Sequence, residues 1–214
     1  MTSIPNAGAA QILREISATI VENKAWLSEI DGKIGDGDHG VNMAKGFGRA
    51  AERTPPDASL TEALQTLSDV LMAEIGGSMG PLYGMMFSDM ADALGDIDQI
   101  DATSFARMLR AGLDGVQEIG SAKKGDKTLL DTLIPAVETF EAHLAMGDSF
   151  GVSLAAMRKA AQDGRDSTLD MVARIGRSAR LGERSRGVLD AGASSCALIL
   201  SGFADEITAR LENA

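Results

Sequence analysis

The 214-residue chain is long enough for one domain with a sizeable core, whereas two domains would be cramped. Its formal net charge of −11 makes nucleic acid a poor partner, and a single cysteine, Cys196, excludes an intramolecular disulfide framework. No apolar run approaches the roughly 20 residues of a membrane span, and the first residues lack a basic region followed by an apolar core. We therefore expect a cytoplasmic protein that makes no membrane contact.

The composition favours helices over strands. Aromatic residues make up only 4% of the chain, while aliphatic residues are plentiful, and a sheet protein would contain more aromatic and β-branched residues. Apolar residues recur at helical spacing almost everywhere, and no useful length shows the alternation of a half-buried strand. The sequence predicts an all-α fold of eight or nine helices without a sheet, in a single domain over residues 1–214.

In chain order, the spacing predicts a first helix over 12–30 and a second from about 38 to 51, whose inward face would carry Val41, Ala44, Phe47 and Ala51. A third follows the N-cap candidates at 57–59 and runs to 75, and a fourth lies between 81 and 94. Thr103 is expected to cap a fifth that ends near 119, and a sixth covers 129–144. Shorter pieces near 148–162 and 167–177 precede a last helix over 192–211.

Glycines cluster at four polar junctions, each at or near a predicted helix start. The junctions are Gly35–Gly40, Gly76–Gly80, Gly125–Thr128 and Asp190–Ala193. A helix start preceded by glycine leaves unpaired N–H groups and the positive end of the helix dipole facing outward, which suits anions. Glycines are also ordinary turn residues, but four such junctions in one helical chain favour anion binding.

The segment from Asp31 to Gly40 contains three carboxylates, those of Asp31, Asp36 and Asp38, within eight residues. Nearby glycines let the backbone fold these side chains towards a common point. Clustered carboxylates repel one another, and a hard divalent cation relieves that repulsion. The segment therefore predicts a metal site, with a solvated acidic turn as the alternative.

Two other metals fit this segment poorly. In a calcium EF-hand loop counted from Asp36, Gly40 would take the fifth position and Phe47 the twelfth, where an oxygen ligand and a glutamate are required. Zinc is disfavoured because His39 is the only nitrogen ligand nearby and no cysteine is close. Mg²⁺, which completes its shell with water and substrate phosphates, remains the prediction.

These motifs resemble a known family. The run Ile34–Met43 closely resembles the metal loop of the dihydroxyacetone kinase L subunit. Later motifs of the same family are similar to Gly80–Gly84, Gly125–Thr128, and Leu181–Ser185 followed by Asp190–Ala193. The matches come in family order and spread over 31–195, so the resemblance covers nearly the whole chain.

The resemblance implies a barrel of eight antiparallel helices with a nucleotide, ADP or ATP, bound at one end. Asp31, Asp36 and Asp38 would hold two Mg²⁺ ions that bridge the phosphates, and together with Arg177 they would be the catalytic residues. The residues implied to contact the nucleotide are His39, Gly40, Val41, Asn42, Ser78, Met79, Gly120, Leu129, Arg177, Asp190, Ala191 and Gly192.

Charge balance supports a role for Arg177. Three carboxylates and a triphosphate bring about seven negative charges, against about four positive charges from two Mg²⁺ ions, so helix N-termini and a cation must supply the rest. Arg177 lies in a basic run from Arg174 to Arg186, and a solvated helix face would also explain such a run. Lys127 is either a phosphate contact or an ordinary surface lysine, with the surface slightly favoured, and His143 is interpreted as incidental.

Three departures from the family pattern fall in the implied nucleotide pocket. Family members usually read Gly-Gly-Ala-Ser-Gly where this chain has Gly-Gly-Ser78-Met79-Gly, so the hydroxyl moves by one residue or the backbone alone makes the contact. Arg180 stands where the family has tyrosine, and Ala191 stands where it has proline. These departures leave the expected fold unchanged and bear on nucleotide preference and partner.

In the family, a histidine on a separate K subunit holds the ketone substrate covalently, and nothing in this chain resembles that subunit. The resemblance thus implies a phosphotransferase that needs a K-type partner, with dihydroxyacetone or another short ketose as acceptor. Either ATP exchanges, or a bound ADP is rephosphorylated by a phosphotransferase-system protein, which a free-standing L chain favours. A non-catalytic regulatory module on the same fold and a plain metal-binding bundle stay open as alternatives, as does a homodimer.

Overall fold

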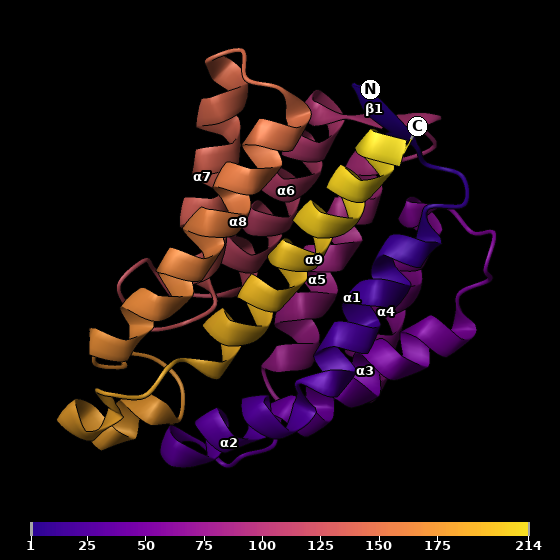
Figure 1. Ribbon diagram of the computed structural model, residues 1–214. Helices are drawn as coiled ribbons and strands as arrows, with labels where there is room; N and C mark the ends of the chain where they lie inside the picture. The colour runs from indigo at the N-terminus through magenta and orange to yellow at the C-terminus, as the bar shows by residue number, and fades with distance from the viewer. Residues whose placement is uncertain (1, 214) are drawn as a thin grey trace.

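The computed structural model describes residues 2–213, and helices dominate it (Figure 1). The α-helices are α1 (Ala10–Glu22), α2 (Lys24–Ile34), α3 (His39–Arg53), α4 (Leu60–Glu74), α5 (Met79–Leu94), α6 (Ala102–Ile119), α7 (Leu130–Ala145), α8 (Phe150–Ser167) and α9 (Ala191–Asn213). Two 3₁₀ helices, η1 (Thr168–Asp170) and η2 (Ser178–Ser185), lie between α8 and α9.

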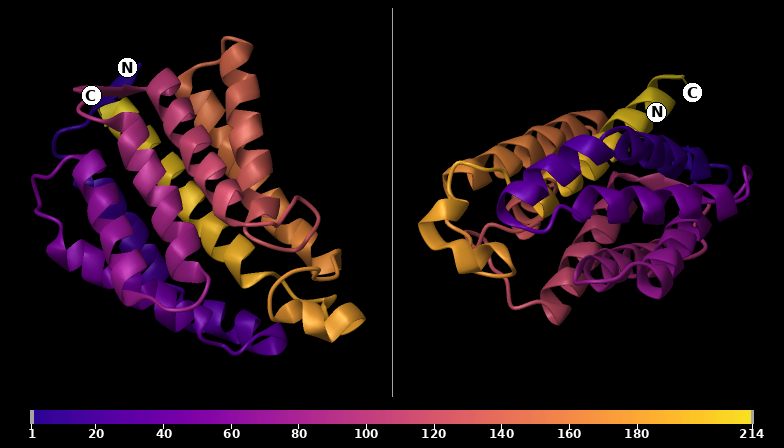
Figure 2. Two further views of the ribbon diagram at one scale, coloured as in Figure 1. Left: turned by 180° about the vertical axis from the view of Figure 1, so that it is seen from behind. Right: turned by 90° about the horizontal axis from the view of Figure 1, so that it is seen from below.

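Eight of these helices form a closed ring within the described residues. In order around the ring, α3 packs on α4, α4 on α5, α5 on α6, α6 on α7, α7 on α8, α8 on α9, α9 on α1, and α1 on α3. The views in Figures 1 and 2 show neighbouring helices running in opposite directions. The expected all-α barrel of eight antiparallel helices is confirmed, and α2 adds a helix across one end.

Local sequence signals explain where several helices begin. Ser59 and Glu62 form a capping box at the start of α4, as the N-cap candidates near 57–59 suggested. Helix α6 is capped by Asp101, whose side chain accepts from the Ser104 amide at 2.8 Å. The expectation that Thr103 caps this helix was wrong by two residues, because an aspartate earlier in the chain already supplies the acceptor.

Three element predictions needed correction. The first predicted helix is two helices, α1 and α2, separated at Asn23, where the chain turns sharply towards the barrel end. The piece near 148–162 is a full helix of 18 residues, α8. Of the piece near 167–177, only Thr168–Asp170 is helical after α8 ends, and its backbone is a 3₁₀ turn.

A two-stranded antiparallel ladder was also not expected. Strand β1 (Ser3–Pro5) pairs with β2 (Gln99–Asp101), with Ser3 opposite Asp101. Three residues are too few to show a period-2 pattern in the sequence. The ladder lies at the end of the barrel opposite α2, where both described ends of the chain are also found (Figure 1).

The buried face of α3 differs from the prediction. The structure buries Gly40, Met43, Phe47 and Ala50, whereas Val41 is 46% exposed. Of the residues expected to face inward, only Phe47 is buried in this face. Hydrophobicity alone misplaced the face, because glycine lets α3 approach its neighbours closely: a Cβ on Gly40 would lie 2.1 Å from the Lys24 carbonyl oxygen in α2.

One large apolar core fills the barrel, and a small second cluster lies under α2. Four of the six phenylalanines in the large core pack edge-to-face or tilted around Phe105 and Phe140, namely Phe105, Phe140, Phe150 and Phe203. The small cluster contains Leu27, Ile30 and Ala191, with Trp26, Leu189 and Leu198 packed against it. It joins α2 to the start of α9, which positions the loops at that end of the barrel. Cys196 is buried, as predicted for a small apolar residue.

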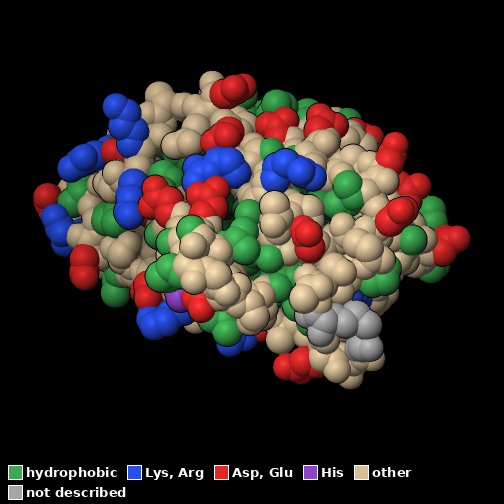
Figure 3. Space-filling view, turned by 90° about the horizontal axis from the view of Figure 1, so that it is seen from above, with side chains coloured by type: hydrophobic (Ala, Val, Ile, Leu, Met, Phe, Trp, Pro, Cys, Tyr) green, Lys and Arg blue, Asp and Glu red, His purple; other side chains and the backbone are tan. Residues whose placement is uncertain are grey.

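None of the described helices is long and apolar enough to cross a membrane. Seen from above, the molecule carries Asp and Glu side chains across much of its surface (Figure 3). This view agrees with the formal net charge of −11.

Candidate functional site

A pocket of about 520 Å³ opens at the end of the barrel that carries α2. Its walls come from the α2–α3 loop, the starts of α5 and α9, the end of α6, the loop before α7, and residues 175–178. Most residues implied by the family resemblance line it: Asp31, Asp36, Asp38, His39, Asn42, Ser78, Met79, Gly120, Leu129, Arg177, Asp190, Ala191 and Gly192. Segments far apart in the chain thus meet around one cavity.

Gly40 and Val41 were implied to contact the nucleotide, but they do not line this pocket. Gly40 is buried where α3 crosses α2, and Val41 points to the surface. The sequence reasoning also missed an apolar wall formed by Leu82, Val116, Ile119 and Ile175. These residues looked like ordinary helix or loop residues in the sequence, since nothing in their spacing separates a pocket wall from a core face.

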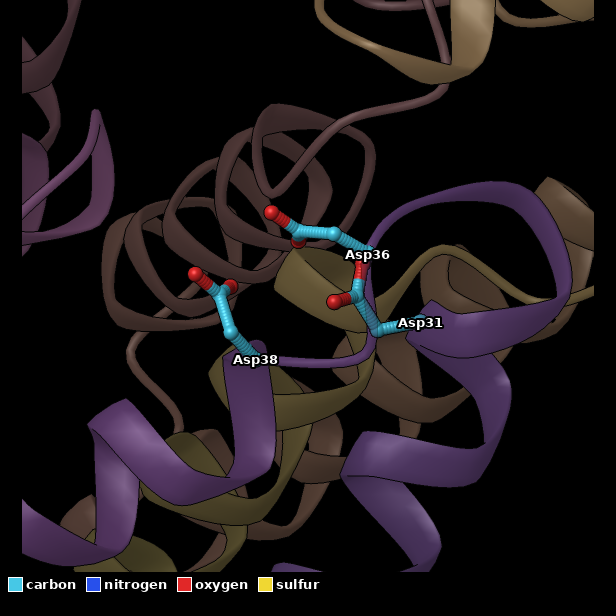
Figure 4. Close-up of side chains that lie close together, drawn as sticks. All are labelled: Asp31, Asp36 and Asp38. Carbon is cyan, nitrogen blue, oxygen red and sulfur yellow. The ribbon is translucent and has the colours of Figure 1, made fainter.

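The three aspartates converge at one side of the pocket (Figure 4). One oxygen from each of Asp31, Asp36 and Asp38 lies within 4.8 Å of the others. Asp31 comes from the last turn of α2 and Asp38 immediately precedes α3, and Gly37 between them has a φ of +79°, which favours glycine. This all-oxygen, all-anionic donor set fits a hard divalent cation.

Arg177, from the segment between α8 and α9, contacts the same cluster. Its guanidinium pairs with the carboxylate of Asp36, and its side chain is 62% exposed. An exposed ion pair contributes little net free energy, so Arg177 can exchange this carboxylate for another anion at small cost. The arrangement places one cation directly beside three carboxylates.

Behind the aspartates, a hydrogen-bond chain links α3, α5 and α9. His39 Nε2 lies 2.9 Å from Ser195 Oγ, which lies 2.8 Å from the Tyr83 hydroxyl, and Tyr83 donates to the Gly192 carbonyl at 3.0 Å. Burial lowers the pKa of His39 to about 4, although nearby Asp31 opposes the shift. His39 is therefore a neutral, fixed side chain at neutral pH.

Sequence reasoning did not single out Tyr83 or Ser195. Tyr83 is the only tyrosine of the chain and belongs to the motif Gly80–Gly84, which offered a signal. It is fully buried, and burial raises the pKa of its hydroxyl well above the usual value. Ser195 had no comparable signal, because it lies in the apolar first half of α9.

Asp190 closes the pocket at the start of α9. Its carboxylate accepts a hydrogen bond from the Ala193 amide at 2.7 Å, which caps the helix. Burial raises the pKa of Asp190 to about 7, and the neighbouring Asp131 carboxylate adds to the shift while Lys127 opposes it. The side chain thus changes its charge close to neutral pH.

Lys127 is not a surface lysine, contrary to the sequence interpretation. It is 1% exposed, and its ammonium donates to the carbonyls of Met171, Ser185 and Val188 at 3.2, 2.5 and 2.6 Å. Burial lowers the pKa of the ammonium, while Asp190 opposes that shift. A lysine between glycine-rich turns reads as exposed in a sequence, because its buried partners are backbone atoms of a distant segment.

Together, the fold and the site define an eight-helix barrel with a carboxylate-bearing pocket at one end. The sequence model of the DAK2 domain matches residues 33–205, and the chain belongs to this family. The resemblance to the dihydroxyacetone kinase L subunit is thereby confirmed.

Similar proteins carry related names. The chain is 37% identical to the "PEP-dependent dihydroxyacetone kinase 1, ADP-binding subunit DhaL" of Listeria innocua, over 89% of this chain and 91% of that protein. It is also 37% identical to the "PEP-dependent dihydroxyacetone kinase, ADP-binding subunit DhaL" of Escherichia coli, over 79% and 82%.

The solved dihydroxyacetone kinase of C. freundii in complex with AMP-PNP and Mg²⁺ is similar to this chain with a TM-score of 0.71 and 26% identity. The similarity covers 94% of this chain and 34% of that one. The two folds therefore correspond over nearly the whole of this chain.

Proposed function

We propose that this chain is a nucleotide-binding phosphotransfer subunit of a dihydroxyacetone-type kinase. The observation that carries the proposal is the convergence of three carboxylates and Arg177 at a pocket of about 520 Å³. That volume lies within the ~300–1,000 Å³ of small-molecule sites. The names of the relatives, which call them ADP-binding subunits, support the choice of ADP or ATP.

In this proposal, Asp31, Asp36 and Asp38 hold two Mg²⁺ ions, and the donor chemistry of the three side chains fits that role. When bound, Mg²⁺ supplies positive charge that offsets the charge of the nucleotide phosphates. Arg177 supplies a further positive charge, and its planar fork of donors suits phosphate oxygens. These four residues are the proposed catalytic group, since phosphoryl transfer depends mainly on positioning and charge.

The rest of the pocket would bind and orient the nucleotide. Ser78 at the N-terminus of α5 makes no side-chain hydrogen bond to its own helix, which leaves the first amides of α5 for phosphate oxygens. Neutral His39 and Asn42 add polar contacts without adding charge. The apolar wall of Leu82, Val116 and Ile119 would take the base, with Gly120, Leu129 and the Asp190–Gly192 turn around the remainder.

The phosphoryl acceptor would be dihydroxyacetone or another short ketose, held on a separate K-type subunit in the cytoplasm. Relatives named PEP-dependent or PTS-dependent dihydroxyacetone kinase favour a bound ADP that a phosphotransferase-system protein converts to ATP. Transfer of the terminal phosphoryl group to a hydroxyl of the ketose then regenerates ADP on this chain. Relatives named erythrulose kinases make a four-carbon ketose a second acceptor to test.

The test is to identify the nucleotide in gently purified protein by mass analysis, with and without a chelator, and then to assay transfer. We expect ADP that is released by chelation, and phosphorylation of dihydroxyacetone when a K-type subunit and a phosphotransferase-system donor are added. A protein that is empty but stabilised by Mg·ATP would replace the bound-ADP mode with nucleotide exchange. Absence of binding for both nucleotides would refute the kinase role and favour a regulatory module.

A further inference from the structure

The burial of Lys127 is costly and needs an explanation beyond packing. An ammonium loses hydration when it is buried, and no carboxylate pairs with it directly among the described residues. Instead, its three N–H donors match three carbonyl acceptors, those of Met171, Ser185 and Val188. All three acceptors belong to one stretch of chain, segment 171–190.

Segment 171–190 forms part of the pocket but contains no α-helix or strand. It contains Arg177 and ends at Asp190, both of which line the cavity. Its other hydrogen bonds to the rest of the chain are made one at a time: the Arg174 amide donates to the Asp126 carbonyl at 3.1 Å, the Gly187 amide to the Leu169 carbonyl at 2.8 Å, and the Asp190 amide to Thr168 Oγ1 at 3.0 Å. The side chain of Arg186 also donates to the Asp170 carbonyl, and that of Arg177 pairs with Asp36. Within such a segment, one side chain that joins three points has a large share in fixing the backbone.

The backbone of Lys127 is itself held in an unfavourable conformation. Its φ of +63° is the only positive value of a non-glycine residue in the described chain, and such a conformation persists where surrounding contacts enforce it. The flanking turn is fixed by Asp131, which accepts from the Gly125 and Thr128 amides at 2.5 and 2.8 Å. The ammonium therefore extends from a rigid turn towards a segment whose regular structure is limited to the 3₁₀ helix η2.

We propose that Lys127 is a positioning residue that fixes segment 171–190, so that Arg177 and Asp190 keep their places in the pocket. This inference rests on the proposed function, because it assigns the fixed segment a part in nucleotide binding. Lys127 acts through the backbone carbonyls it binds, whereas the aspartates of the cluster come from α2 and the α2–α3 loop.

The test compares Lys127→Met with Lys124→Met, which removes an exposed lysine from the same turn. Hydrogen exchange of the nucleotide-free protein reports on the segment, and calorimetry measures affinity for Mg·ADP. Binding of Mn²⁺ alone reports on the aspartate cluster. For Lys127→Met we expect faster exchange confined to amides 171–188, at least tenfold weaker Mg·ADP binding, and Mn²⁺ binding at least as tight as in the wild type, because a displaced Arg177 no longer competes with the metal for Asp36. Lys124→Met should match the wild type in all three.

A second variant, Lys127→Gly, guards against a failure to fold, since glycine adopts this backbone conformation without strain. It should loosen the same amides and weaken Mg·ADP binding in the same way. Unchanged exchange and affinity in both variants would overturn the proposal and leave the proposed function standing. Faster exchange throughout α4 and α5, or loss of folding in both variants, would also overturn it, by showing a role in general stability. A wild type that binds no ADP would contradict the proposed function and the functional half of this inference, while hydrogen exchange would still decide whether Lys127 holds the segment.

Discussion

The guanidinium of Arg177 contacts the carboxylate of Asp36, although the two residues lie in loops at opposite ends of the sequence. The contact joins the stretch of chain between α8 and α9 to the α2–α3 loop, and both line the pocket. Arg177 thus occupies the carboxylate that a metal ion would use. Pairing of Arg177 with Asp36 and binding of a metal ion to Asp36 therefore compete.

Replacing Asp36 by asparagine should abolish the stabilisation of the protein by Mg·ADP. The change keeps the size of the side chain but removes one of three anionic donors, and hard cations bind neutral amides less strongly. Thermal unfolding with and without Mg·ADP measures the effect, and we expect a shift in Tm for the wild type and almost none for the variant. Asp69→Asn, which alters an exposed carboxylate of α4, should keep the full shift. An equal shift in Asp36→Asn and the wild type would remove Asp36 from the site.

Replacing Arg177 by methionine should change metal and nucleotide binding in opposite directions. Without the guanidinium, Asp36 is free, so Mn²⁺ alone should bind up to about fivefold more tightly, which corresponds to the ~0.2–1 kcal/mol of an exposed ion pair. Mg·ADP should bind about tenfold more weakly, a loss of about 1.4 kcal/mol, because a phosphate contact disappears. Titrations with Mn²⁺ and with ADP give both numbers, and the control is Arg174→Met, which removes an exposed arginine of the same segment that does not line the pocket. Weaker binding of both Mn²⁺ and Mg·ADP would argue against a competition between Arg177 and the metal ion for Asp36.

Asp190 should make the free protein less stable as pH rises towards neutrality. Its pKa is raised from 3.8 to about 7 on folding, so between these values the folded state binds more protons than the unfolded state, and stability falls with rising pH. Asp190→Asn keeps an acceptor for the Ala193 amide and removes the charge. We expect its Tm to exceed that of the wild type at pH 8 and to approach it near pH 4.

His39 has the opposite effect on the wild-type profile, since its lowered pKa removes stability as pH falls from 6.5 to about 4. Both proteins contain His39, so the difference between Asp190→Asn and the wild type isolates Asp190. A difference in Tm that is the same at every pH would show that Asp190 does not titrate in this range.

Gly40→Ala should destabilise the fold, and Gly48→Ala should not. An added Cβ on Gly40 would lie 2.1 Å from the Lys24 carbonyl oxygen, whereas one on Gly48 meets only a Val21 methyl at 3.9 Å. Both glycines lie in α3, Gly40 in its first turn and Gly48 in its interior, where the gain in helix propensity applies in full. Urea unfolding should show a loss of about 1–3 kcal/mol for the first and a gain of up to about 1 kcal/mol for the second. Equal changes in the free energy of unfolding for the two variants would mean that α3 does not approach α2 at Gly40 as closely as the 2.1 Å contact requires.

The regular spacing of apolar residues predicted most of the helices, and the family resemblance implied their arrangement in a barrel. Polar side chains cap the starts of α4, α6 and α8. The sequence predicted the buried face of α3 poorly, since Gly40 has no apolar side chain and yet lies at the closest helix contact. The ladder of β1 and β2 was missed because it is only three residues long on each side.

The candidate site was predictable to the extent that its parts are close in sequence or belong to a family motif. Asp31, Asp36 and Asp38 lie within eight residues, and glycines between them indicate a tight turn. Nothing local indicates that Arg177 meets Asp36, so that expectation depended on the family resemblance. The burial of Lys127 and the hydroxyl of Ser195 behind His39 depend on distant partners, which a single sequence does not reveal.

A natural fluorophore packs against the small apolar cluster under α2. Trp26 is the only tryptophan of the chain, and it packs, like Leu189, against the cluster that contains Ala191. Leu189 and Ala191 lie at the junction of segment 171–190 with α9, next to the pocket. The fluorescence of Trp26 therefore reports on its surroundings in α2 and at this junction, so its emission wavelength can follow ligand-driven rearrangement there in real time, without an attached dye.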